Sequence, residues 1–142
     1  MSTPNQIRPF ARVALIEIGG SHDECLYSQC LFLQGHAEVT LVVTRDLLDR
    51  IALCRHLVDS VTVLSFDSVE AFSWLNIWRL RNYLCSQRFD QVIFNTAQGR
   101  IKKLFVLPLP RRTRMLGVIH NTRKFRGSVG QWLISRYVRR YW

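Results

Sequence analysis

The residues of this chain best suited to chemistry form two polar clusters, each placed directly after an apolar run that reads as a strand. The first cluster is residues 19–24 (GGSHDE) and the second is residues 120–124 (HNTRK). A strand that breaks into glycines and then a helix is how alternating α/β folds build a ligand site. His22 and His120 are suited to contact a hydroxyl group or to exchange a proton near neutral pH. The plain alternative is that both histidines are structural.

Gly19 and Gly20 let a ligand approach the backbone closely, although they can equally serve only the geometry of a turn. Their spacing is not G-x-G-x-x-G, and Asp23 and Glu24 occupy the first helical turn, where they would repel a phosphate. The sequence also lacks HExxH, P-loop, GxSxG and D-x-D motifs, which weighs against hydrolase and NTPase functions. We therefore expect neither a bound cofactor nor a metal.

The elements that must position these clusters alternate between strands and helices. The strands are expected at residues 10–18, 38–43, 60–66, 91–95 and 114–119. The helices are expected at residues 21–34, 45–57, 67–87 and from 128 onward. Such alternation predicts one Rossmann-like α/β domain over residues 1–142, with a mostly parallel sheet of about five strands and helices on both faces.

Short signals set the expected helix ends. Ser21 with Glu24, and Asp67 with Glu70, have the spacing of a capping box that opens a helix, and Gly35 stops the first helix. The helix expected at residues 67–87 is apolar around most of its circumference, so we expect it to be buried rather than to meet a second surface.

In a parallel sheet with right-handed crossovers, the carboxyl ends of all strands share one edge, where ligands bind. The residues expected there are Gly19, Gly20, His22, Asn95, Thr96, His120 and Asn121. By the same logic Arg111, Arg112 and Arg114 precede the last strand and belong to the opposite edge.

Charge is distributed unevenly along the chain. Residues 1–71 carry a net charge of −4 and residues 72–142 carry +14, which together give the total of +10. This asymmetry indicates an anionic partner, either nucleic acid or a membrane surface rich in acidic lipids, with a solvated basic face as the alternative.

The compartment follows from what the sequence lacks. There is no long apolar run and no signal-peptide pattern, so we expect a cytoplasmic protein. The four cysteines form no CxxC pair and lie in apolar stretches, as buried reduced thiols do: Cys25, Cys30, Cys54 and Cys85.

Four passages carry a resemblance to a known family: FARVALIEIGG, the SHDE that follows it, LFLQGHAEVTLVV, and MLGVIHNTRKF at the last strand. Over nearly its whole length the chain resembles the N-terminal, acceptor-side half of two-domain GT-B glycosyltransferases. The resemblance implies that Gly19, Gly20 and His120 face the cleft between acceptor and nucleotide sugar, with His22 and Asn121 adjacent. It implies metal-free transfer of a sugar to an acceptor hydroxyl, with His120 contacting the sugar and His22 as the base.

The same resemblance implies partners. GT-B enzymes have a second α/β domain that grips the nucleotide, so we expect this chain to need a C-terminal nucleotide-binding domain, either as the rest of a longer enzyme or as a separate subunit. The expected acceptor is a glycan or glycolipid, and the nucleotide sugar is a substrate. Basic residues near the active edge are expected to contact phosphate or hold the protein at the inner face of an anionic membrane: Arg100, Lys102, Lys103, Arg123, Lys124 and Arg126.

Two other functions share parts of this argument. A non-catalytic nucleic-acid-binding module would explain the charge, but the sequence has no RRM, KH or helix-turn-helix pattern. A flavodoxin-like or phospho-receiver domain would explain the fold, but the acidic pair after the first strand and the lysine after the fifth are missing.

Overall fold

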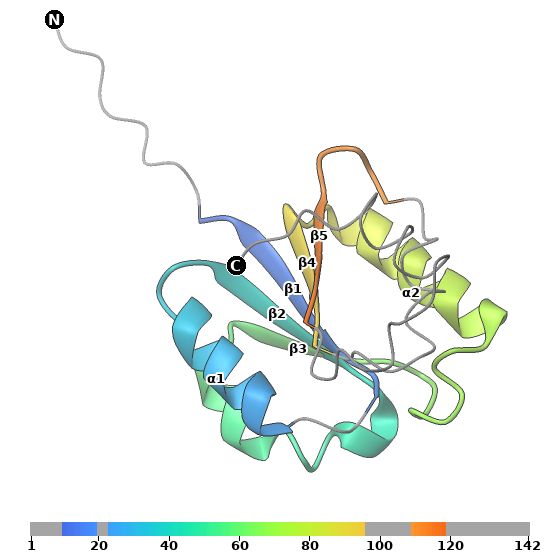
Figure 1. The fold of residues 1–142 in the computed structure, drawn as a ribbon, viewed down its shortest axis with the longest axis horizontal. Helices are drawn as coiled ribbons and strands as arrows, with labels where there is room; N and C mark the ends of the chain where they lie inside the picture. The colour runs from blue at the N-terminus through green and yellow to red at the C-terminus, as the bar shows by residue number, and fades with distance from the viewer. Residues whose placement is uncertain (1–9, 20–22, 96–108, 119–142) are drawn as a thin grey trace, which may run out of the picture.

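A parallel β-sheet of five strands forms the centre of the computed structural model, which describes residues 10–19, 23–95 and 109–118 (Figure 1). The strands are β1 (Arg12–Glu17), β2 (Glu38–Val43), β3 (Ser60–Val63), β4 (Gln91–Phe94) and β5 (Arg114–Gly117). Their spatial order is β3-β2-β1-β4-β5, and all four neighbouring pairs are parallel. The expected Rossmann-like α/β fold is confirmed.

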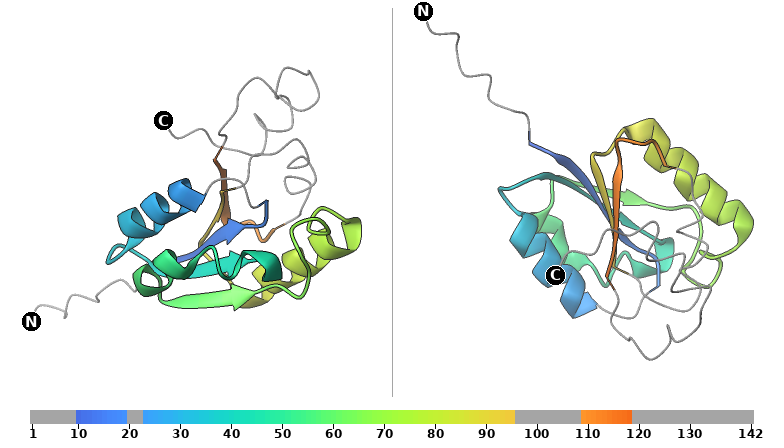
Figure 2. Two further views of the ribbon diagram at one scale, coloured as in Figure 1. Left: turned by 90° about the horizontal axis from the view of Figure 1, so that it is seen from below. Right: turned by 45° about the horizontal axis from the view of Figure 1, so that its top comes forward.

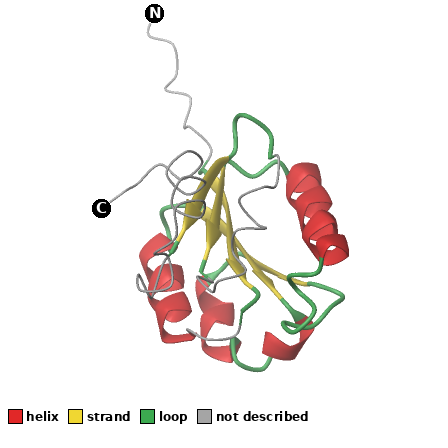
Figure 3. Cartoon of the chain, turned by 45° about the vertical axis from the view of Figure 1, so that its right-hand side comes forward, coloured by secondary structure: helices red, strands yellow, loops and turns green. Residues whose placement is uncertain are grey.

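Helices cover both faces of the sheet. On one side lie α1 (Asp23–Leu33) and two short 3-10 helices, η1 (Arg45–Leu47) and η2 (Ala52–Leu57), and on the other lies α2 (Trp74–Gln87) (Figures 1 and 2). Side chains of β1 alternate between the two layers, as strand geometry requires: Leu15 packs with the α1 layer, while Ala14 and Ile16 pack with the α2 layer. The core is therefore two apolar layers separated by the sheet, and helices lie on both sides of the strands in Figure 3.

The segment after β2 differs from the expected single helix over residues 45–57. Its backbone hydrogen bonds join residues three apart, as in Leu47 N–H to Thr44 C=O and Cys54 N–H to Ile51 C=O, so it forms η1, a turn and η2. Leu47, Ile51 and Cys54 are nevertheless buried against the sheet. Apolar residues spaced three to four positions apart can line one side of either an α-helix or a 3-10 helix. The sequence pattern therefore could not distinguish the two, and the predicted single α-helix was wrong.

The start of α2 also differs from the prediction. Ser73 is its N-cap and accepts a hydrogen bond from the Asn76 N–H at 3.3 Å. The expected start at Asp67 and Glu70 is wrong, because this stretch forms successive turns in which Glu70 N–H bonds Asp67 C=O and Ser73 N–H bonds Glu70 C=O. By contrast, α1 ends as expected, with Gly35 in the left-handed region at a φ of 74°.

Helix α2, predicted over residues 67–87 as a buried helix, is buried on one side only. Ile77, Leu80 and Leu84 of α2 are buried, but Trp74 and Trp78 on its other side are 62% and 53% exposed. One side of α2 therefore faces away from the sheet. Within the described residues, no helix combines the length and apolarity needed to cross a membrane.

Candidate functional site

The sheet reverses its direction of growth between β1 and β4. From β1 the chain moves outward through β2 to β3, and it then crosses back to place β4 on the other side of β1. Open α/β sheets bind ligands at the carboxyl edge of such a switch point, because the two crossovers leave on opposite faces there. Ile16 of β1 is paired with Phe94 of β4, so the residues that follow them meet at this edge.

A buried carboxylate lies at the centre of this edge. Glu17 is only 1% exposed, and its two oxygens accept hydrogen bonds from the Gly19 N–H at 2.8 Å and the Asn95 side-chain amide at 2.6 Å. A buried charge is costly unless such bonds compensate it. Glu17 therefore ties the first glycine after β1 to the residue that ends β4.

The network continues into α1. The side-chain N–H of Gln29 donates to the Asn95 side-chain oxygen at 2.8 Å, and the Asn95 backbone N–H donates to Ile16 C=O at 2.9 Å. The Gln29 Oε1 atom is buried and has no hydrogen-bond partner among the described residues. Three elements that are distant in sequence thus share one polar chain, which we call the Glu17 network: Glu17, Asn95, Gln29 and Gly19.

Chemistry fixes the direction of this network. A carboxylate has only acceptor atoms, so the Asn95 amide must turn its N–H group toward Glu17 and its oxygen toward Gln29. Gln29 must then donate to Asn95, which leaves its own oxygen at the end of the chain. The Glu17 network therefore ends in a buried acceptor atom that is unsatisfied among the described residues.

Of the residues predicted for the carboxyl edge, the structure brings Gly19 and Asn95 together, both through Glu17. The others lie outside the described residues, so their placement stays a prediction: Gly20, His22, Thr96, His120 and Asn121. The same holds for the expected phosphate or membrane contacts: Arg100, Lys102, Lys103, Arg123, Lys124 and Arg126.

Sequence reasoning missed Glu17 and Gln29. Glu17 had a usable signal, because it is the single acid within the apolar run FARVALIEI, and an acid inside a buried strand must have partners. Gln29 had none, since a glutamine in the middle of an amphipathic helix is ordinary. The predicted position of Arg111, Arg112 and Arg114 is confirmed: these exposed residues lead into the amino end of β5.

A second polar contact at the carboxyl edge joins the segments that follow β2 and β3. The Asp46 carboxylate accepts hydrogen bonds from the Ser68 backbone N–H, at 2.9 Å, and from the Ser68 hydroxyl. Partial burial raises the pKa of Asp46, but hydrogen bonds from Ser68, from the Thr44 side chain and from the backbone of Asp46 outweigh it, and the pKa lies below its ordinary value of 3.8. This contact fixes a turn and leaves Asp46 exposed.

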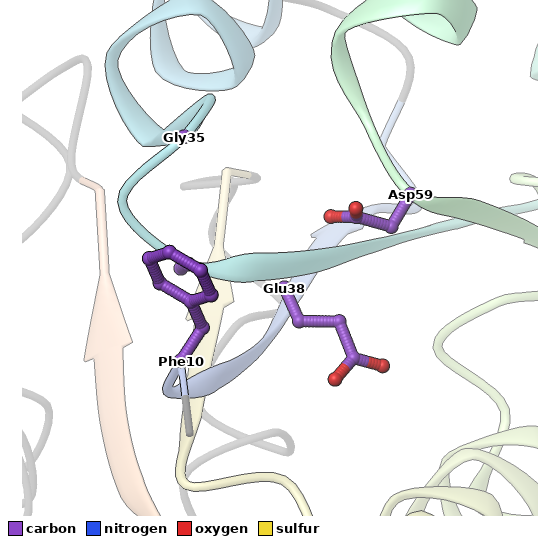
Figure 4. Close-up of a pocket in the computed structure, with 5 residues that line it drawn as sticks. Phe10, Gly35, Glu38 and Asp59 are labelled. Atoms are coloured by element: carbon purple, nitrogen blue, oxygen red, sulfur yellow. The ribbon is translucent and has the colours of Figure 1, made fainter. Parts of the chain in front are cut away.

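A hollow of about 400 Å³ lies at the opposite edge, where β2 begins (Figure 4). Its lining residues are Phe10, Gly35, Ala37, Glu38 and Asp59. The two carboxylates point in different directions, and each has a partner: Glu38 lies 3.5 Å from Arg12, and Asp59 accepts the Val39 N–H at 2.6 Å. This hollow lacks a set of convergent polar groups, so the carboxyl edge is the better candidate site.

No disulfide joins the cysteines of the described residues. Cys30 and Cys54 are buried as predicted, whereas Cys25 and Cys85 are only partly buried. Burial, together with the neighbouring Cys54, raises the pKa of Cys30 to about 12, so this thiol stays protonated and unreactive. Among the described residues, no group of three or more His, Cys, Asp or Glu side chains is placed to hold a metal ion.

Comparison with known proteins adds no family to this description. No protein-family model and no curated protein matches the sequence. What the structure establishes is the α/β fold and a buried polar network at the switch point of its sheet.

Proposed function

We propose that this chain is the acceptor-binding half of a GT-B glycosyltransferase. The observation that carries the proposal is the Glu17 network, because it holds Gly19 and Asn95 at the switch point of a parallel sheet. It also ends in a hydrogen-bond acceptor on Gln29. Hydroxyl groups are the donors that sugars offer in abundance, and amide oxygens are common partners for them.

The reaction transfers a sugar from a nucleotide sugar to an acceptor hydroxyl. The acceptor oxygen forms a bond to the anomeric carbon, the bond from that carbon to the phosphate oxygen breaks, and the nucleoside diphosphate leaves with the electron pair. A base takes the acceptor proton, and the sugar ring passes through a state with oxocarbenium character. In this proposal His22 is the base, His120 contacts the sugar, and a second nucleotide-binding domain or subunit holds the donor.

A location at the inner face of the membrane fits this function. Residues 72–142 carry a net charge of +14, and a lipid-linked acceptor would be presented at an anionic surface. The proposed location is therefore cytoplasmic and peripheral.

The test is ligand binding at the carboxyl edge. We expect saturation-transfer NMR on the purified chain to detect contact with glycans or glycolipid head groups. Gln29→Leu should abolish this contact, because it removes both polar atoms of the side chain. Asp59→Asn, at the amino edge, is the matched control and should leave the contact unchanged. With a radiolabelled nucleotide sugar, the chain alone should form no transfer product.

Two outcomes would contradict the proposal. One is saccharide binding that Gln29→Leu leaves intact. The other is the absence of saccharide binding together with salt-dependent binding of generic RNA or DNA, which would favour the nucleic-acid module instead.

A further inference from the structure

Helix α2 has an outward face that is aromatic at its start and basic further along. Trp74, Leu75 and Trp78 are 62%, 61% and 53% exposed. Arg79 is exposed, and the Arg81 guanidinium lies 4.7 Å from the centroid of the Trp78 ring. Residues spaced by three and four positions share one side of a helix, so these side chains form one continuous surface, the α2 ridge.

The core does not need this ridge. The other side of α2 supplies Ile77, Leu80 and Leu84, which are buried against the sheet at 1%, 1% and 2% exposure. The sheet core is therefore served by this side of α2, while both tryptophans on the other side are more than half exposed. Clustered exposed aromatic side chains mark a surface that meets a partner or a membrane.

The ridge begins at the same edge as the Glu17 network. Because α2 connects two parallel strands, β3 and β4, it starts at the carboxyl edge of the sheet and runs back toward the amino edge (Figure 1). Its aromatic end is therefore on the ligand side of the molecule. Val69, which is 83% exposed, lies in the turns just before this end.

Charge identifies what the ridge meets. No residue of α2 is acidic, and Arg79, Arg81 and the C-cap residue Arg88 are all cationic. The acids that flank the helix in sequence are Asp67 and Glu70, in the turns before it, and Asp90, just after its C-cap. Tryptophan prefers the boundary between lipid head groups and acyl chains, and arginine reaches from there to lipid phosphates.

We propose that the α2 ridge docks this protein on an anionic phospholipid membrane. Trp74, Leu75 and Trp78 enter the boundary region, while Arg79 and Arg81 contact the phosphates. This assignment deepens the proposed peripheral location by naming the surface that makes it, and it does not depend on sugar transfer. Docking through this end would hold the carboxyl edge of the sheet close to the lipid surface.

The test is co-sedimentation of the full chain with vesicles of phosphatidylcholine alone or mixed with phosphatidylglycerol. We expect binding to the mixed vesicles only, weakened by added salt. Trp78→Ser should lower the partition coefficient about tenfold, through lost apolar burial. Arg79→Gln should lower it about fivefold, through the loss of one charge near the lipid surface.

Matched controls come from the opposite side of the sheet. Phe32→Ser on α1 removes an aromatic side chain that is 76% exposed, and Arg55→Gln in η2 removes an exposed charge. Both should bind vesicles like the parent chain. All substituted residues are exposed, so circular dichroism should show every variant folded.

Three results would overturn the proposal: no binding to either vesicle, binding that the α2 variants leave unchanged, or self-association without lipid that Trp78→Ser removes. The last result would assign the ridge to a second copy of the chain. None of these results changes the outcome of the saccharide-binding test. The membrane-docking proposal and the sugar-transfer proposal can therefore fail independently.

Discussion

The two edges of this sheet use carboxylates in opposite ways. At the amino edge, Asp59 and Asp90 form the same motif twice. The Asp59 backbone N–H donates to Val39 C=O while its side chain accepts the Val39 N–H, and Asp90 makes the same pair of bonds with Arg12. Each aspartate precedes one strand and fastens it to its neighbour, and each is exposed.

At the carboxyl edge, Glu17 is buried, and one of its partners is a side chain. It accepts from a backbone N–H two residues on and from a side chain 78 residues away. The amino-edge motif therefore pairs strands, whereas the Glu17 network joins the end of β4 to the residue that follows β1 and to α1. Burial and a side-chain partner distinguish Glu17 from the amino-edge aspartates, although the chemical group is the same; sequence distance does not, since Asp90 and Arg12 are also 78 residues apart.

Removing the Glu17 carboxylate should give the largest loss of stability at either edge. Glu17→Leu leaves the Gly19 N–H and the Asn95 amide buried without their acceptor, and we expect it to lower the free energy of unfolding by about 3 kcal/mol. Urea unfolding followed by circular dichroism measures the change. Glu17→Gln, which keeps the shape and one oxygen, is the control and should cost less than half as much. If Glu17→Leu lowered the free energy of unfolding by less than Asp90→Ala does, the carboxyl-edge carboxylate would not be the more important of the two for stability.

The repeated amino-edge motif should give a smaller effect. Asp59→Ala and Asp90→Ala each remove one hydrogen bond to a strand N–H, part-buried at Asp59 and exposed at Asp90, and we expect each to cost about 1 kcal/mol in the same urea experiment. Their strands are three places apart in the sheet, roughly 14 Å at ordinary strand spacing, so the double variant should be additive. Asp59→Asn and Asp90→Asn keep an acceptor oxygen and should stay closer to the parent. If the loss of stability in the double variant differed strongly from the sum of the two single losses, the two aspartates would not act independently.

Asp46 sharpens the comparison, because it lies at the carboxyl edge but is exposed. Its pKa is below 3.8 in the folded protein, so the unfolded chain takes up the proton first as the pH falls. The contribution of Asp46 to stability is therefore present above its ordinary pKa and is lost as the pH falls through the lower folded value. Asp46→Asn should reduce the acid-induced drop in the urea midpoint by a small amount, since an exposed pair is screened by solvent.

The control for Asp46 is Asp49→Asn in the same segment, which has no contact with Ser68 among those described and should keep the acid response of the parent. If Asp46→Asn retained the full acid response, the Ser68 contact would contribute nothing measurable. The contribution of an exposed carboxylate to stability would then not depend on the edge of the sheet at which it lies.

Much of the fold was predictable because it depends on local pattern. The run FARVALIEI is long, apolar and rich in β-branched residues, and it forms β1 as predicted, with only its ends trimmed. The start of α2 was less predictable. Asp67 has the spacing of a helix cap, but Asp46, from another segment, accepts a hydrogen bond from Ser68 and holds that stretch in turns. The helix therefore begins after its N-cap residue Ser73.

The candidate site was predictable in place but not in content. Gly19 and Asn95 follow strands, so the topology rule put them on one edge, and the Glu17 network joins them there. Gln29 could not be predicted, because its role depends on which strand end lies beneath α1. The outward tryptophans of α2 were predicted to be buried, since an apolar sequence does not say which of its sides meets the sheet.

By itself, the sequence determined the alternation of strands and helices and the edge where strand ends gather, because apolar periodicity and glycine positions act over a few residues. Only the tertiary structure decided that Glu17 meets Asn95 and that Gln29 completes the chain. It also decided that Trp74 and Trp78 face outward. The physical reason is that these contacts join residues far apart in the chain, and such contacts exist only once the order of the strands is fixed.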